Sequence, residues 1–180
     1  MKRLLWLGAA AVVAGVAAWL LLAPPNEVQR LRYPLRYASI VRGHAHNYDL
    51  DPALLAAVIE TESKFKANAK SSSGAIGLMQ LLPSTAHGIA VHTGGNNFHT
   101  EDLYNPEINV RYGAWYLRHL LDKYDDERDA LAAYNAGQDN VDRWLAGGSG
   151  IRFSETRAYV NRVEKLKRIY RDVWGSQLGE

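Results

Sequence analysis

The apolar segment near the N-terminus constrains this chain more than any other feature of its sequence. Residues 4–23, LLWLGAAAVVAGVAAWLLLA, contain no charged residue. A helix of this length spans about 30 Å, the thickness of the hydrocarbon core of a bilayer. The preceding Lys2 and Arg3 predict a cytoplasmic N-terminus, with the rest of the chain on the other side of the membrane. We therefore expect residues 1–23 to form a transmembrane anchor, with the membrane contacted through residues 4–23.

A cleaved signal peptide is the alternative interpretation of this segment. Its apolar region would be about 7–15 residues long and would end at a site with small residues. Here the apolar run is longer, and cleavage after Ala23 would place Leu21 where a small residue is preferred. These two observations favour the uncleaved anchor. Both interpretations place the rest of the chain in the cell envelope, in the periplasm or otherwise outside the cytoplasmic membrane.

Composition and charge exclude several classes of function. The chain has no cysteine, which excludes disulfides, thiolate metal sites and a cysteine nucleophile. Without Lys2 and Arg3 the 21 basic residues become 19, equal to the 19 acidic residues, so nothing in the charge indicates nucleic-acid binding. The spacings of His87, His92 and His99, and of His44 and His46, match no common metal motif. We expect surface histidines, no metal and no cofactor.

The remaining sequence predicts one mainly α domain. Residues 24–37 are expected to form a tether, and residues 38–180 the domain itself. Asp51-Pro52 and Asn105-Pro106 each combine a good N-cap with proline at the first helical position, and they predict helices to about residues 65 and 124. Gly113 within the second helix predicts a close contact between helices.

The other expected elements follow from turn and capping signals. A short helix should begin near Pro83 and be followed by a long polar loop over residues 87–104. Gly137 should separate two short helices. The last helix should begin with Ser154 as its cap. Its predicted buried face consists of Val160, Val163, Leu166, Tyr170 and Val173.

Two glutamates on the first of these helices are expected to differ. Leu54, Leu55, Val58 and Ile59 define its apolar face. At about 100° per residue, Glu62 falls near the middle of that face, whereas Glu60 falls almost opposite and should be solvated. Loss of hydration would raise the pKa of Glu62 and make it a proton donor near neutral pH. The alternative is a helix-end glutamate that turns out to water.

Other polar residues stand at positions suited to a binding groove. Residues 71–74 form a turn, and Gly74 and Gly77 allow a close backbone approach. Gln80 carries both a donor and an acceptor. Tyr134 and Asn135 end a helix, where side chains can face a cleft. An ordinary loop and a core aromatic residue remain the structural alternatives.

Four motifs together resemble a known family. Glu62-Ser63, Gly77-Leu78-Met79-Gln80, the run AYNAG at residues 133–137, and Glu155-Thr156-Arg157 with Tyr159-Val160 are similar, in order and spacing, to the lytic transglycosylase domain of the soluble type, glycoside hydrolase family 23. The resemblance covers about residues 38–175. It implies a lysozyme-like helical fold with a substrate groove. It also implies cleavage of the β-1,4 bond between N-acetylmuramic acid and N-acetylglucosamine in peptidoglycan strands, with formation of a 1,6-anhydromuramoyl end.

The resemblance also assigns residue roles. It implies that Glu62 is the sole catalytic carboxylate, first a proton donor to the glycosidic oxygen and then a base for the C6 hydroxyl. It implies substrate contacts for five residues: Ser71, Gln80, Tyr134, Asn135 and Glu155. Glu155 also has a structural explanation, because the helix dipole favours a carboxylate in the first turn.

The absence of a second carboxylate separates the two enzymatic alternatives. Ordinary glycosidases use two carboxylates, and residues 63–100 contain none. An internal hydroxyl needs no second carboxylate and has a high effective concentration. This favours a transglycosylase over a goose-type muramidase, which is a hydrolase. A non-catalytic wall-binding scaffold subunit is the third alternative, and the intact Glu62 argues against it.

Overall fold

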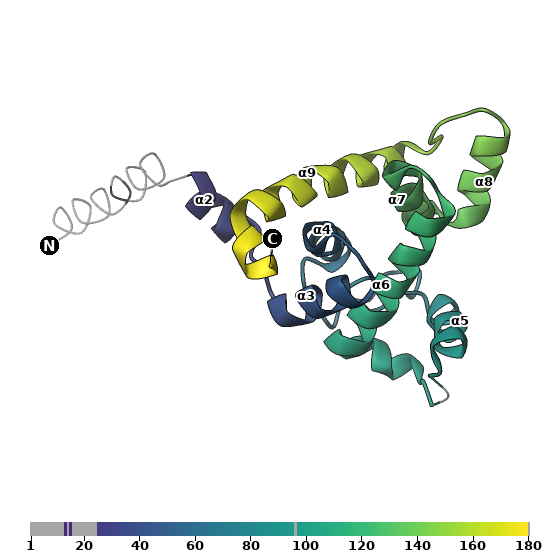
Figure 1. Cartoon of the computed structure of the whole chain (residues 1–180), viewed down its shortest axis with the longest axis horizontal. Helices are drawn as coiled ribbons and strands as arrows, with labels where there is room; N and C mark the ends of the chain where they lie inside the picture. The colour runs from purple at the N-terminus through teal and green to yellow at the C-terminus, as the bar shows by residue number, and fades with distance from the viewer. Residues whose placement is uncertain (1–12, 14, 16–24, 96, 180) are drawn as a thin grey trace, which may run out of the picture. The chain divides into compact units, whose positions relative to one another are not determined.

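The computed structural model describes residues 13, 15, 25–95 and 97–179, and it divides the chain into two compact units, Met1–Pro34 and Leu35–Glu180 (Figure 1). Apart from Val13 and Gly15, the predicted anchor of residues 4–23 lies outside the described residues. Within the described residues, no helix has the length and apolarity needed to cross a bilayer. The first unit contains α2, Pro25–Arg32, so part of the expected tether is helical.

The second unit is helical, which confirms the prediction of a mainly α domain. Its elements are α3 (Ala38–Asn47), α4 (Pro52–Ser63), α5 (Pro83–Thr93), the short 3₁₀ helix η1 (Thr100–Tyr104), α6 (Pro106–Lys123), α7 (Glu127–Ala136), α8 (Gln138–Ala146) and α9 (Ser154–Leu178). Two isolated antiparallel bridges join Lys70 to Ile76 and Ile76 to Leu81, and the described residues form no longer strand.

Side-chain caps mark the starts of α4 and α6, two helices that contribute residues to the groove. Asp51 Oδ1 accepts hydrogen bonds from the backbone N–H groups of Ala53 (2.8 Å) and Leu54 (3.2 Å) at the start of α4. Asn105 Oδ1 accepts from the N–H of Glu107 (2.9 Å) at the start of α6. Both starts agree with the sequence prediction because a capping side chain acts within two or three residues of itself.

Two predicted boundaries are wrong. Residues 87–104 are not a continuous loop, because α5 continues to Thr93 and η1 covers Thr100–Tyr104. Ile89 and Leu103 are buried in one hydrophobic cluster, and that burial orders a stretch that is polar overall. Ser154 is the first residue of α9 and not its cap, since the capping position belongs to Phe153 without any side-chain hydrogen bond.

Helix α4 is buried on nearly every side, and it is seen end-on between α9 and α3 in Figure 1. Its residues from Ala53 to Glu60 are all buried. The prediction that Glu60 is solvated is therefore wrong, because its side of α4 faces α9 and only 6% of the residue is exposed. Burial raises the pKa of Glu60, while the charges of Arg162 and Lys64 and a hydrogen bond from Tyr170 act in the opposite direction.

Two smaller predictions need correction. His44 is buried and not a surface residue, and its Nε2 lies 2.8 Å from Glu107 Oε1. Gly113 does mark a close approach, but the contact is with a loop and not with another helix. A Cβ at Gly113 would lie 2.2 Å from Sδ of Met79, so only glycine admits the loop here.

Candidate functional site

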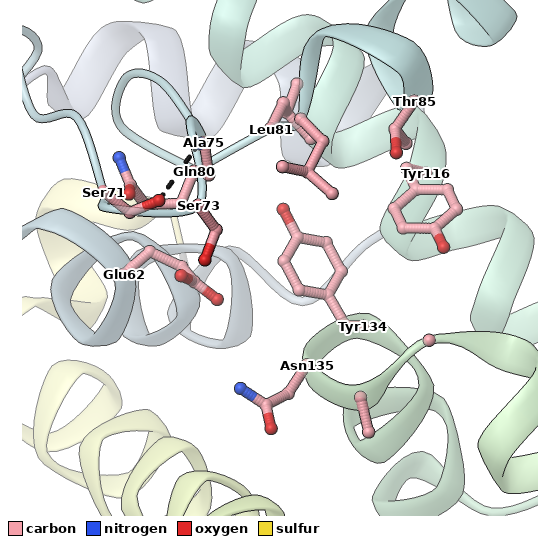
Figure 2. Close-up of a pocket in the computed structure, with 13 residues that line it drawn as sticks. Glu62, Ser71, Ser73, Ala75, Gln80, Leu81, Thr85, Tyr116, Tyr134 and Asn135 are labelled. Carbon is pink, nitrogen blue, oxygen red and sulfur yellow. Dashed lines mark hydrogen bonds between the residues drawn. The ribbon is translucent and has the colours of Figure 1, made fainter.

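The last turn of α4 delivers Glu62 to a cavity of about 430 Å³ (Figure 2). In Figure 2 its carboxyl group points into the space between the Ser71–Ala75 turn and Tyr134. The other lining residues come from the loop before α5, from α5 and α6, and from the end of α7: Ser71, Ser73, Ala75, Gln80, Leu81, Leu82, Thr85, Tyr116, Tyr134, Asn135, Ala136 and Gly137. Among the described residues that line this groove, Glu62 is the one carboxylate.

The surroundings of Glu62 suit a proton donor. Burial raises its pKa from 4.5 to about 7. The hydroxyl of Tyr159 donates a hydrogen bond of 2.7 Å to Glu62 Oε1, which favours the charged form and limits that rise. Burial and the nearby Glu62 raise the pKa of Tyr159 well above 10, so the phenol stays neutral. A carboxyl group with this pKa can both donate and accept a proton near neutral pH. None of the described residues that line the groove is a lysine, arginine or histidine.

One buried amide shapes the loop that carries Gln80. The Nδ2 of Asn109 donates to the carbonyl oxygens of Ile76 (2.9 Å) and Leu103 (2.8 Å). Its Oδ1 accepts from the N–H of Met79 (2.8 Å). At Gly77, where φ is +84°, a Cβ would lie 2.1 Å from Asn109 Nδ2. The loop therefore passes so close to α6 that only glycine fits.

This loop orders two of the predicted substrate contacts. Ser71 Oγ accepts from the N–H of Ala75 (3.0 Å), the bond drawn in Figure 2, so the turn holds the hydroxyl at the groove. Gln80 Nε2 donates to the carbonyl oxygens of Gly77 (2.9 Å) and Ala69 (3.3 Å). Because these bonds occupy the amide nitrogen, the amide oxygen of Gln80 remains to accept from a ligand.

The end of α7 supplies the opposite wall. The hydroxyl of Tyr134 donates to the carbonyl oxygen of Met79 (2.8 Å), which joins α7 to the loop. Asn135 Oδ1 accepts from Thr156 Oγ1 (2.9 Å) on α9, which leaves the amide nitrogen of Asn135 to donate. Gly137 follows with φ +85° and ψ 148°, a conformation that essentially only glycine adopts, and it turns the chain from α7 into α8.

The structure brings together most, but not all, of the residues predicted from the sequence. Glu62, Ser71, Gln80, Tyr134 and Asn135 line one groove. Glu155 does not: it is exposed in the first turn of α9, so its substrate contact stays a prediction. No role at the groove was predicted for four residues, Ser73, Asn109, Tyr116 and Tyr159. Tyr159 belongs to the last of the four family motifs, so the sequence did point to this residue. Nothing near it in the sequence pairs it with Glu62.

Comparison with known proteins places the chain in a family. Residues 39–152 match the family model described as Transglycosylase SLT domain. The chain is 32% identical over 158 residues to the soluble lytic murein transglycosylase of Salmonella typhimurium, covering 81% of this chain and 24% of that protein. It is 32% identical over 173 residues to membrane-bound lytic murein transglycosylase C of Histophilus somni, covering 79% of this chain and 48% of that protein.

A solved structure shows the same arrangement of helices. Lytic transglycosylase Slt from Pseudomonas aeruginosa, solved as an inactive variant with one glutamate replaced by glutamine, has a TM-score of 0.73 and 33% identity, covering 79% of this chain and 25% of that one. This chain thus spans about a quarter of the length of the soluble relatives it matches. With a family model matched over most of its second unit, the chain belongs to the transglycosylase SLT domain family.

Proposed function

We propose that this protein is a peptidoglycan lytic transglycosylase that cleaves the β-1,4 bond between N-acetylmuramic acid and N-acetylglucosamine. The observation that carries the proposal is a single groove carboxyl group, Glu62, whose pKa of about 7 lets it both donate and accept a proton near neutral pH. The relatives it matches are lytic murein transglycosylases, and one is inactive after a glutamate-to-glutamine exchange.

The chemistry requires one acid and no water. Protonated Glu62 gives its proton to the glycosidic oxygen, and the bond from that oxygen to C1 of the muramic acid breaks. The C6 hydroxyl oxygen of the same sugar then bonds to C1, and its proton returns to the Glu62 carboxylate. Because the attacking hydroxyl belongs to the same sugar, its effective concentration at C1 is high. The reaction therefore needs neither a bound water nor a second carboxylate to activate one. Glu62 ends each cycle as it began.

Product analysis tests this proposal. Purified peptidoglycan is digested with the full chain in heavy-oxygen water, and the fragments are examined by mass spectrometry. A transglycosylase yields 1,6-anhydromuramoyl ends without heavy oxygen. Reducing ends that carry heavy oxygen would identify a muramidase, and intact strands would identify a binding subunit. Either of these two results would refute the proposal.

The hydrogen bond from Tyr159 leads to a prediction about pH. The protonated form of Glu62 starts the reaction, so the cleavage rate should fall as pH rises through about 7. Tyr159→Phe removes a donor that stabilises the carboxylate, so the pKa of Glu62 should rise further and the alkaline limb should move to higher pH. The measurement is a pH–rate profile of both proteins. Superimposable profiles would show that Tyr159 does not tune Glu62.

We also propose that the domain works in the cell envelope, held at the membrane by residues 4–23. The uncharged run and a relative named as membrane-bound support this proposal. The full chain expressed in a bacterium should stay in the membrane pellet after alkaline carbonate extraction. A variant that begins at Pro24 should be released to the supernatant. Release of the full chain as well would argue for cleavage or for the absence of an anchor.

A further inference from the structure

We infer that Thr156 is a positioning residue of the groove: its buried hydroxyl fixes the side-chain amide of Asn135 so that the amide nitrogen faces the ligand and donates a hydrogen bond to it. The proposed function supplies the ligand, a glycan strand, so the inference rests on that function. It adds the direction of one hydrogen bond in the groove and the residue that sets this direction. Figure 2 shows Asn135 and Tyr134 on one side of the cavity and Glu62 on the other.

The hydroxyl of Thr156 is enclosed by protein. Thr156 stands in the first turn of α9, and only 2% of the residue is exposed. Its hydroxyl donates to Oδ1 of Asn135 at 2.9 Å, across 21 positions of the sequence. Among the described residues this is the one hydrogen bond of that hydroxyl. The Thr156 proton therefore depends on Asn135 for an acceptor.

This dependence decides which way round the Asn135 amide lies. The oxygen and the nitrogen of an amide have nearly the same outline, so their hydrogen bonds distinguish the two orientations. In the opposite orientation the amide nitrogen would donate to the Thr156 oxygen, and the buried hydroxyl proton would have no acceptor. A buried donor without an acceptor is costly, so the amide oxygen faces Thr156.

The amide nitrogen of Asn135 is then left on the groove side. Asn135 lines the cavity and is exposed, whereas Thr156 is buried. In the part of the chain that the structure describes, this nitrogen has no hydrogen-bond partner. An amide nitrogen can only donate, so Asn135 requires an acceptor on the ligand, such as a hydroxyl, ring or acetamido oxygen of a sugar.

The same face of α9 also holds Glu62. Tyr159 follows Thr156 by three positions, so the two side chains lie on one face of the helix. Tyr159 donates to Glu62 at 2.7 Å, and α9 packs against both α4 and α7. The proton donor and the Asn135 amide are thus oriented from one helix before a glycan enters. An exposed side chain without such a partner would have to be ordered on binding, which lowers affinity.

Thr156→Val tests the positioning role. Valine has nearly the shape of threonine but no hydroxyl, so the Asn135 amide would lose its partner and rotate freely. In a full-length Glu62→Gln chain, calorimetry with soluble glycan strands of peptidoglycan should show binding about 3- to 10-fold weaker than for the parent. Thr156→Ser keeps the hydroxyl and should bind like the parent. A valine variant that binds like the parent, or a serine variant as weak as the valine variant, would overturn the inference.

Two further variants separate positioning from packing. Thr93→Val is the matched control, because the Thr93 hydroxyl donates to the Ile89 carbonyl oxygen (2.9 Å) and Thr93 does not line the groove. Its affinity should equal that of the parent. In an Asn135→Ala chain, Thr156→Val should cause no further loss of affinity. A loss that adds in full would show that Thr156 acts without Asn135, contrary to the inference.

Asn135→Asp tests the direction of the hydrogen bond to the ligand. At neutral pH an aspartate can still accept from Thr156, but it has no proton to give to a sugar oxygen. We expect this variant to bind about tenfold more weakly than the parent in the same calorimetric experiment. Binding as tight as that of the parent would show that Asn135 accepts from the ligand, and the assigned orientation would be wrong.

The proposed function fails by a different observation. If the wild-type chain gave no anhydro ends while the affinity pattern above held, the transglycosylase proposal would be wrong and Thr156 would still position Asn135. If the anhydro ends formed and Thr156→Val bound like its parent, this inference alone would be wrong. Thermal unfolding of each variant shows whether a loss of affinity reflects unfolding.

Discussion

Replacing Glu62 by glutamine is expected to slow peptidoglycan cleavage by about 100- to 10,000-fold while the domain stays folded. Glutamine has nearly the same shape as glutamate and can still accept the hydrogen bond from Tyr159, but it has no proton to give to a glycosidic oxygen. The measurement is the initial rate of release of soluble fragments, with glycan binding followed in parallel. Binding should survive because the other groove residues are unchanged.

Glu60→Gln is the matched control for this experiment. Glu60 lies on the same helix and is also a buried carboxyl group with a raised pKa, but it does not line the groove. Its replacement should leave the cleavage rate at the wild-type level. If Glu62→Gln cleaved at that level as well, the assignment of the proton donor would be wrong.

The same exchange has an expected effect on stability that depends on pH. The folded-state pKa of Glu62 is raised from 4.5 to about 7, so between these values the folded protein binds more protons than the unfolded chain. Stability therefore falls as pH rises through this window, by up to about 3 kcal/mol at 1.36 kcal/mol per pKa unit. Glutamine avoids this cost, so Glu62→Gln should be the more stable protein at pH 8 and nearly equal to wild type at pH 4.

Chemical denaturation at the two pH values measures this effect. A variant that is less stable than wild type at pH 8 would show that the Glu62 carboxylate is well solvated, contrary to the structure. A gain in stability with a loss of activity would identify Glu62 as a residue held at an energetic cost for its function.

Replacing Asn109 by alanine is expected to give the largest loss of stability, about 3–5 kcal/mol. Asn109 is fully buried, and its three hydrogen bonds satisfy Met79, Ile76 and Leu103. Without it, the N–H of Met79 and the carbonyl of Leu103 would lose this partner in the interior, and the Ile76 carbonyl would keep only its bond from the Leu81 N–H (3.0 Å). Urea unfolding measures the change. Activity should fall too, because the loop also holds Gln80 at the groove.

Asn105→Ala is the control for this prediction. Asn105 stands four residues earlier, at the start of the same helix, and makes one exposed capping bond to Glu107. Its loss should cost about 1 kcal/mol and leave the groove intact. Similar losses for the two variants would mean that the Asn109 bonds are no more valuable than a surface cap.

Much of the fold could be predicted from short-range patterns. Asp51-Pro52 and Asn105-Pro106 start their helices as expected, and Gly137 separates α7 from α8. The buried face of α9 also agrees with its apolar spacing. Capping, helical periodicity and glycine conformation each depend on residues within a few positions of one another, so the sequence alone contains the necessary information.

The errors arise where distant segments meet. Helical geometry correctly placed Glu60 opposite the apolar face of α4, but it could not show that α9 covers that side. In the same way, nothing near His44 in the sequence identifies Glu107, 63 residues later, as its hydrogen-bond partner. Burial of a polar group depends on what the rest of the chain places against it.

The sequence by itself determined the type of domain, the ends of its main helices and the identity of one isolated carboxyl group ahead of a Ser/Gly turn. Only the tertiary structure decided how that carboxyl group behaves. Tyr159, which is 97 residues from Glu62 in the sequence, donates a hydrogen bond to its carboxylate. Asn109, about 30 residues from the loop that carries Gln80, holds that loop by a hydrogen bond to Met79. A pKa is set by desolvation and by hydrogen-bond partners at a few ångströms, and those distances exist only after the chain has folded.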